Sequence, residues 1–268
     1  MRWNGLALSL TLLTVIPVPG AVPPPSAHVP EAPEPPDPDT VAAAMAWAPT
    51  VGLLLGGIAA AVLVVADHPL GVGPLTAAGL AVAALALLTR GLHLDGLADL
   101  ADGLGSGLPA ARALDIMRRS DIGPFGIVTL VLTLVIQVGA LAHAEAAGGG
   151  RGPAALIAAA VTGRLALTWA CRRGVAAARR EGLGAFVAGT VRPAVAVGIT
   201  LIVLAAAVSV VRTAFTLPLA VVAGLAAAFV LQRHAVRRLG GITGDVLGAL
   251  IETAATVTLV VAAMGPPA

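Results

Sequence analysis

Residues 91–103 read GLHLDGLADLADG and hold three of the chain's fourteen acidic residues, Asp95, Asp99 and Asp102. Their spacing of i, i+4 and i+7 places all three carboxylates on one face of a helix. Like charges at this distance repel each other unless a cation lies between them. Because Mg²⁺ binds one or two carboxylates together with waters and substrate phosphates, the motif predicts a Mg²⁺ site. The alternative is a solvated acidic loop just outside a membrane.

The sequence around this motif is typical of an integral membrane protein. The 268 residues are 58% hydrophobic and 11% charged, with a mean hydropathy of +0.96, whereas soluble domains carry about 25% charged residues. All sixteen basic residues are arginines, and the net charge of +2 is too small to indicate a nucleic-acid partner. The single cysteine, Cys171, excludes an intrachain disulfide. We expect one membrane domain over residues 1–268, with the lipid bilayer as its surroundings.

Hydropathy predicts an all-α fold with about seven transmembrane helices. Residues 3–16 form a short apolar stretch that is too short to be a clear spanning helix. Residues 17–40 hold ten of the twenty prolines, which predicts an extended linker in water. The longer apolar segments cover residues 41–66, 73–89, 124–143, 154–170, 194–211, 217–232 and 246–264.

The arginines predict the orientation in the membrane. Twelve of the sixteen fall in loops 90–123, 171–193 and 233–245, which all lie on one side of the predicted bundle. The positive-inside rule therefore assigns these loops to the cytoplasm. The acidic motif belongs to the first of them, so we expect its chemistry to take place at the cytoplasmic face.

Two stretches in these loops are suited to binding phosphate. Glycines at 103–107 and the guanidinium of Arg118 can approach an anion, although a flexible connector is an equally good interpretation of the glycines. Residues 179–184 read RREGLG and include Arg180. Anchoring by positive charge explains the arginines of this loop, but it does not explain the glycines beside them.

Four further ionisable residues lie in or near apolar sequence. Asp245 opens the last apolar segment, where it could serve the helix dipole, and Glu252 follows on the same helical face. Arg164 lies within an apolar segment and must either face a polar cavity or reach toward the interface. His93 is compatible with a base, a phosphate contact or an interfacial histidine. Together with the three carboxylates, these residues indicate phosphoryl transfer.

Four motifs, in this order, resemble the cobalamin synthase family, whose systematic name is adenosylcobinamide-GDP ribazoletransferase. They are HLDGLADLADG at 93–103, IMRRSDIG at 116–123, REGLG at 180–184 and GITGDVLGALIE at 241–252. The likeness begins at LTVIPVP, residues 13–19, and ends at Glu252, so it covers nearly the whole chain.

The resemblance implies a Mg²⁺-dependent, polytopic enzyme of the inner membrane that completes the nucleotide loop of cobalamin. Such an enzyme transfers adenosylcobinamide phosphate from adenosylcobinamide-GDP to α-ribazole, or its 5′-phosphate, and releases GMP. It implies Asp95, Asp99 and Asp102 as metal ligands, and we add Asp102 or His93 as the candidate base. The predicted substrate contacts are Arg118, Ser120, Arg164, Arg180, Asp245 and Glu252. A homo-oligomer is also compatible with the sequence.

Two positions depart from the family pattern. Val15 stands where the family usually has arginine, and Arg119-Ser120-Asp121 stands where it usually has Asp-Ser-Arg. The alternatives are a CDP-alcohol phosphotransferase and a small cation permease. The order of histidine, aspartates and glycines in residues 93–103 disfavours the first, and the position of the aspartates beyond a helix end disfavours the second.

Overall fold

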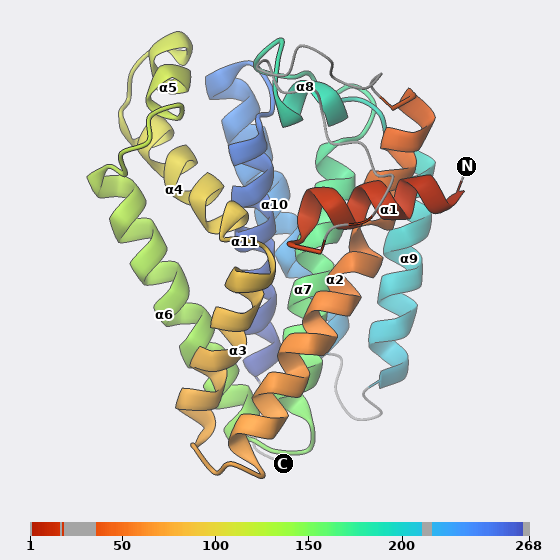
Figure 1. Cartoon of the computed structure of the whole chain (residues 1–268), viewed down its shortest axis with the longest axis vertical. Coiled ribbons are helices and arrows are strands. Elements are labelled where there is room, and N and C mark those ends of the chain that lie inside the picture. Colours follow the sequence, from red (N-terminus) through yellow and green to blue (C-terminus); the bar gives the residue numbers. More distant parts are fainter. Residues whose placement is uncertain (1, 17, 19–35, 211–215, 265–268) are drawn as a thin grey trace.

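The computed structural model describes residues 2–16, 18, 36–210 and 216–264, and within them the chain folds into helices (Figure 1). The helices are α1 (Arg2–Leu13), α2 (Pro38–Asp67), α3 (Pro74–Leu88), α4 (Leu92–Gly105), α5 (Ala110–Ile116), α6 (Pro124–Ala146), α7 (Arg151–Ala170), α8 (Leu183–Val187), α9 (Pro193–Val210), α10 (Thr216–Leu239) and α11 (Gly244–Ala263). Within these described residues, the only β-type backbone pairing consists of two isolated bridges. The predicted all-α class is confirmed.

All seven predicted apolar segments are helical, and they correspond to α2, α3, α6, α7, α9, α10 and α11. Five helices, α2, α6, α7, α10 and α11, are long and apolar enough to cross a membrane. A bend of 88° separates α3 from α4, and this pair makes a sixth crossing only if it is counted as one broken span. The 15 residues of α3 rise about 22 Å, which is less than the bilayer core of about 30 Å. The predicted number of seven is therefore approximate.

Two predicted boundaries differ in the structure. The linker expected at 17–40 ends earlier, because Asp37 accepts a hydrogen bond from the Thr40 amide (2.8 Å) and α2 already begins at Pro38; residues 19–35 of that linker lie outside the described part. The segment expected as loop 90–123 contains α4 and α5. These short helices lie at the end of the bundle that also carries α8 (Figure 1).

Helix α1 lies crosswise over the bundle and does not run parallel to α2 (Figure 1). Its 12 residues are too few to cross a bilayer. The chain just after it is tied to the end of α3, because the Val15 amide donates a hydrogen bond to the Leu88 carbonyl (2.8 Å). The apolar stretch predicted at 3–16 therefore covers one end of the bundle.

Helix α7 lies at the centre of the bundle, between α2 and α11, and close contacts of small residues hold it there. A Cβ atom added to Gly52 of α2 would lie 2.5 Å from the Ala160 carbonyl oxygen of α7, and one added to Gly56 would lie 3.0 Å from Ile157 Cα. Glycines at both positions allow the two backbones to approach directly, as is common between transmembrane helices.

The outer helices present apolar side chains to their surroundings. Exposed large apolar residues on α6 and α9 are Phe125, Ile127, Val128, Val131, Leu132, Val135, Ile136, Val195, Val197, Leu201, Ile202 and Val208. An apolar surface of this extent would be unstable in water but matches hydrocarbon. The chain is therefore a multi-pass membrane protein.

Candidate active site

Helix α4 carries the acidic motif and begins at a sharp turn. Arg90 (φ 55°) and Gly91 (φ 67°) both adopt the left-handed region, which glycine does at little cost, and this redirects the chain between α3 and α4. Helix α4 is therefore turned toward the α5 and α8 end of the bundle, where it packs against α6 and α11 (Figure 1). Asp95 is exposed, Asp99 is half-buried and Asp102 is buried. The predicted placement of these aspartates on one helix is confirmed.

Helices α4 and α11 approach each other through glycines of two distant motifs. A Cβ atom added to Gly96 would lie 2.9 Å from both Cα and the carbonyl oxygen of Asp245. One added to Gly248 would lie 3.1 Å from Cα of His93. Without side chains at these positions, the first turn of α11 packs directly on α4. This contact places the carboxyl group of Asp245 next to those of α4.

The start of α11 is fixed by its own cap. The Val246 amide donates to Thr243 Oγ1 (3.2 Å), which satisfies a free amide of the first turn. The same hydroxyl donates to Asp245 Oδ2 (3.2 Å), so it also orients that carboxylate. Thr243 was not among the predicted site residues, although its place before the last apolar segment is typical of an N-cap.

A short backbone pairing brings a third segment to the site. The Ala178 amide donates to the Ile242 carbonyl (3.0 Å), and the Ile242 amide donates to the Ala176 carbonyl (2.9 Å). Gly241 packs against this same stretch of backbone, where a side chain would not fit. The pairing holds Arg179 over the site, and its guanidinium donates to the Leu114 carbonyl (2.5 Å).

The charges of these segments act on one another. Burial, followed by the charges of Asp95, Asp245 and Asp102, raises the pKa of Asp99 to about 7, while Arg179 opposes that rise. Asp99 thus lies among three other carboxylates with one nearby guanidinium. A cation bound among these carboxylates would relieve their mutual repulsion.

Asp102 has an additional role that its spacing did not reveal. Its Oδ2 accepts a hydrogen bond from the Gly123 amide (2.7 Å) and its Oδ1 accepts one from the Gly126 amide (2.9 Å). These amides belong to the N-terminus of α6, where a carboxylate is favoured by the helix dipole. Asp102 therefore anchors α6 to α4. Its roles as a metal ligand and as a base stay predictions.

Three residues that were predicted separately meet in a buried polar layer beneath the aspartates. His93, Arg164 and Glu252 are placed so that the charge of Arg164 acts on both of the others, and the three line a small cavity of about 30 Å³ together with Gln137. Gln137 Nε2 donates to Glu252 Oε2 (2.9 Å). Arg164 is buried, and its Nε has no hydrogen-bond partner. Arg164 therefore faces an internal cavity that it shares with His93, Gln137 and Glu252, and it does not reach toward the interface.

The remaining predicted substrate contacts lie at the exposed end of the site. Arg118 and Ser120 are exposed in the turn between α5 and α6, and the charge of Arg118 acts on Arg179. Arg180 is exposed, whereas its neighbour Arg179 is the residue directed among the carboxylates. The sequence contains both arginines, but only the pairing at Ile242 distinguishes them.

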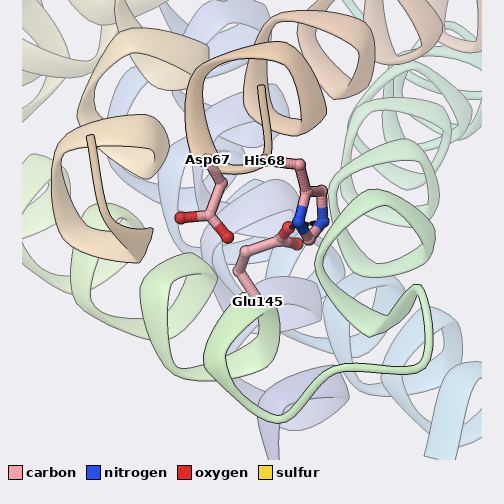
Figure 2. A group of neighbouring side chains, drawn as sticks. All are labelled: Asp67, His68 and Glu145. Atoms are coloured by element: carbon pink, nitrogen blue, oxygen red, sulfur yellow. Dashed lines mark ion pairs between the residues drawn. The ribbon is translucent and has the colours of Figure 1, made fainter. Parts of the chain in front are cut away.

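A second ionisable cluster lies at the opposite end of the bundle, where α2 and α6 end (Figure 2). Asp67, His68 and Glu145 form it, and among the described residues it is the one group of three whose metal-binding atoms all lie within 4.8 Å of one another. His68 Nε2 lies 3.5 Å from Glu145 Oε1. Sequence analysis did not identify this cluster, because its members are ordinary end-of-helix residues.

The fold and the site together define a polytopic α-helical membrane protein whose acidic and basic residues converge at one end of the bundle. The family described as CobS, cobalamin-5-phosphate synthase, matches residues 5–263. The chain therefore belongs to the cobalamin-5-phosphate synthase family, as its motifs predicted.

Curated relatives agree with this assignment. The chain is 43% identical to an adenosylcobinamide-GDP ribazoletransferase from Frankia casuarinae, over 97% of this chain and 94% of that protein. It is 40% identical to one from a Nocardioides species, over 83% and 87%, and 35% identical to one from Chlorobaculum tepidum, over 97% and 95%. No solved structure matches the chain.

Proposed function

We propose that this protein transfers the adenosylcobinamide phosphate moiety from adenosylcobinamide-GDP to α-ribazole, or its 5′-phosphate, and releases GMP. The observation that carries the proposal is the convergence of Asp95, Asp99 and Asp245, with the charge of Arg179 acting on Asp99 and Asp245, at one end of the bundle of a cobalamin-5-phosphate synthase. Phosphoryl transfer relies on positioning and on charge stabilisation, which such a group of residues provides. The alternative of a CDP-alcohol phosphotransferase is not favoured by the family match.

In this reaction the ribazole hydroxyl oxygen attacks the cobinamide-linked phosphorus. The bond from that phosphorus to the oxygen of GMP breaks, GMP departs with the electron pair, and the hydroxyl proton passes to a base. We assign the base role to His93 in preference to Asp102. His93 lines the same cavity as Asp95 and Asp245 and can accept a proton on a ring nitrogen, whereas both oxygens of Asp102 already accept backbone hydrogen bonds.

The donor set of the site is suited to Mg²⁺. Asp95, Asp99 and Asp245 offer carboxylate oxygens. Burial and then the charges of Asp95, Asp245 and Asp102 raise the pKa of Asp99, and a divalent cation would relieve the part that comes from the neighbouring charges. Bound there, Mg²⁺ would supply charge neutralisation for a pyrophosphate. Arg179, from the opposite side, would pair with the phosphate of the departing nucleotide, and Asp102 would keep the loop before α6 in place.

We further propose that the site faces the cytoplasm of a bacterial inner membrane. The loops that form this end of the bundle carry twelve of the sixteen arginines, which the positive-inside rule assigns to the cytoplasm. The only native cysteine, Cys171, is buried, so an introduced thiol can report the orientation. A Ser120→Cys variant should react with an impermeant maleimide in inside-out vesicles and not in intact spheroplasts. The opposite labelling pattern would refute this orientation.

The activity itself is tested with purified protein in lipid nanodiscs, supplied with both substrates and Mg²⁺. Mass spectrometry should detect the cobamide and GMP in equal amounts, and chelation of divalent ions should stop their formation. An Asp95→Asn variant, which preserves the shape of this exposed side chain, should remain folded in the membrane and form neither product. Absence of both products with the wild-type protein would refute the proposed function.

A further inference from the structure

A partly open cavity of about 160 Å³ lies beside the carboxylates. Asp95 and Asp245 line one side of it, together with His93, and these residues come from α4 and the first turn of α11. The remaining walls come from α1, α2, α7, α8 and α11. A molecule bound in this cavity would therefore have one end among the residues to which the transfer reaction is assigned.

Away from those three residues, the walls of the cavity are apolar. The side chains that form them are Leu12, Leu13, Met45, Leu92, Leu167, Leu183, Val187, Leu247 and Ile251. Most of them belong to the buried core. Such walls favour an apolar ligand, because a polar group placed against them would lose its hydrogen bonds to water without replacement.

The size and polarity of the cavity distinguish the chemical parts of the two substrates. The corrin ring is far too large for 160 Å³, since an apolar cavity of about 150 Å³ accommodates a single benzene molecule. Guanine is small enough, but its polar edges would face aliphatic carbons. The base of α-ribazole is a benzimidazole with two methyl groups, which is flat, bicyclic and largely apolar. It matches the apolar walls, and because it is larger than benzene it would fill the cavity and extend toward the open side, where the exposed Asp95 lies.

We infer that this cavity binds the benzimidazole base of α-ribazole and directs its ribose toward Asp95 and Asp245. The inference rests on the proposed function and adds a subsite to it. With the base inside the cavity, the ribose hydroxyl lies at the wall formed by His93, Asp95 and Asp245. The acceptor alcohol is thereby presented to the carboxylates and to the proposed base, while the larger donor approaches from the exposed side, where Arg118 lies.

This subsite also explains the REGLG motif that sequence analysis left without a clear role. Gly184 packs on the backbone of Ile242 and Thr243, where a Cβ atom would lie 2.5 Å from the Ile242 carbonyl oxygen. That contact fixes the short helix α8 over the cavity, so that Leu183 and Val187 become part of its wall. Leu183 is only partly buried and therefore tolerates change better than the core residues around it.

The test is steady-state kinetics of a Leu183→Trp variant, with each substrate varied in turn. A larger side chain reduces the space for the base, so the KM for α-ribazole should rise about tenfold or more. The KM for adenosylcobinamide-GDP should stay within about twofold. The riboside of unsubstituted benzimidazole lacks the two methyl groups, so its KM should rise less in this variant than the KM for α-ribazole does. A Leu108→Trp variant, at an exposed leucine that does not line the cavity, is the matched control.

A rise in the KM for adenosylcobinamide-GDP alone, or equal KM values for the Leu183→Trp variant and wild type, would overturn the inference. If Leu183→Trp does not fold, Leu183→Ala serves in its place, and it should relax the preference between the dimethylated and unsubstituted bases. An unchanged preference in that variant would also overturn the inference. These outcomes are distinct from failure of the proposed function, in which the wild-type protein itself forms no GMP.

Discussion

The two ends of the bundle both gather ionisable residues, but they hold them differently. At the far end, Asp67, His68 and Glu145 lie close together, and a histidine is available to pair with the acids (Figure 2). At the site end, Asp99 is surrounded by like charges, and the guanidinium of Arg179 compensates them only in part. Repulsion between fixed carboxylates costs stability, so a fold retains it where a ligand relieves it.

The ends also differ in what holds their residues in place. The far cluster joins the ends of α2 and α6 through the side-chain contact between His68 and Glu145, and one glycine of α7, Gly152, packs on Glu145. The site cluster joins α4, α11 and the loop before α8 through direct backbone contacts at Gly96, Gly241 and Gly248. The two clusters therefore differ in the charges that surround them and in the backbone contacts that support them.

Replacing one carboxylate at each end should give the largest difference between them. Asp99→Asn removes a charge at the centre of the site cluster, and turnover should fall on the order of 100-fold or more. Glu145→Gln removes a charge of the far cluster, and turnover should stay within about twofold. The measurement is GMP release per mole of protein in nanodiscs. Equal losses in both variants would show that the two clusters contribute alike.

Adding one methyl group at each end separates stability from activity. In Gly96→Ala the new Cβ meets the backbone of Asp245, which cannot move aside, so α11 must shift relative to α4. A misplacement of this kind should lower turnover by roughly 10- to 100-fold. In Gly152→Ala the new Cβ meets Glu145, so the disturbance is confined to the far end.

Both glycine variants should melt at a lower temperature than wild type in detergent, but only Gly96→Ala should lose activity. If Gly152→Ala lost as much turnover as Gly96→Ala, the effect would have to be ascribed to general destabilisation of the bundle. The comparison then would no longer support a special role for the contact between α4 and α11.

A pair of neighbouring arginines gives a smaller and more local contrast. Arg179 lies among the carboxylates and should pair with phosphate, so Arg179→Met should lower kcat/KM for adenosylcobinamide-GDP about tenfold. Arg180→Met, one residue further along and exposed, should change it by no more than about threefold. If Arg180→Met had the larger effect, Arg180 would be the substrate contact, as the sequence pattern predicted.

Much of the fold could be predicted from hydropathy, because a bilayer requires long apolar helices wherever the chain crosses it. All seven apolar segments are helical. What hydropathy missed are the features set by backbone geometry. The turn at Arg90 and Gly91 redirects α4, and the cap at Asp37 begins α2 inside the predicted linker. Neither feature changes the apolar content of a segment, so hydropathy cannot predict either of them.

The sequence predicted which kinds of residue form the site, but it predicted only in part how those residues come together. The spacing of Asp95 and Asp99 placed them on one helical face, because helical periodicity is local. The choice of Arg179 over Arg180 depends on a backbone pairing with Ile242, far along the chain. The hydrogen bonds of Asp102 likewise depend on where α6 begins. Contacts between distant segments of this kind have no signature in spacing.

The raised pKa of Asp99 predicts the smallest effect, on the pH dependence of stability in a chelating buffer. Its pKa is about 7 in the folded protein, against the ordinary value of 3.8, so the folded state binds this proton more tightly than the unfolded state. The stability contributed by that proton is fully present below pH 3.8 and is lost as the pH rises through about 7. The melting temperature should therefore fall by a few degrees between about pH 5 and pH 7.5.

The Asp99→Asn variant, which cannot titrate at this position, isolates the effect from other ionisable groups, because its melting temperature should depend less steeply on pH. Added Mg²⁺ should flatten the wild-type profile by stabilising the charged carboxylates. A profile that is equally steep in wild type and Asp99→Asn would mean that the charge excess assigned to the site end does not determine its stability.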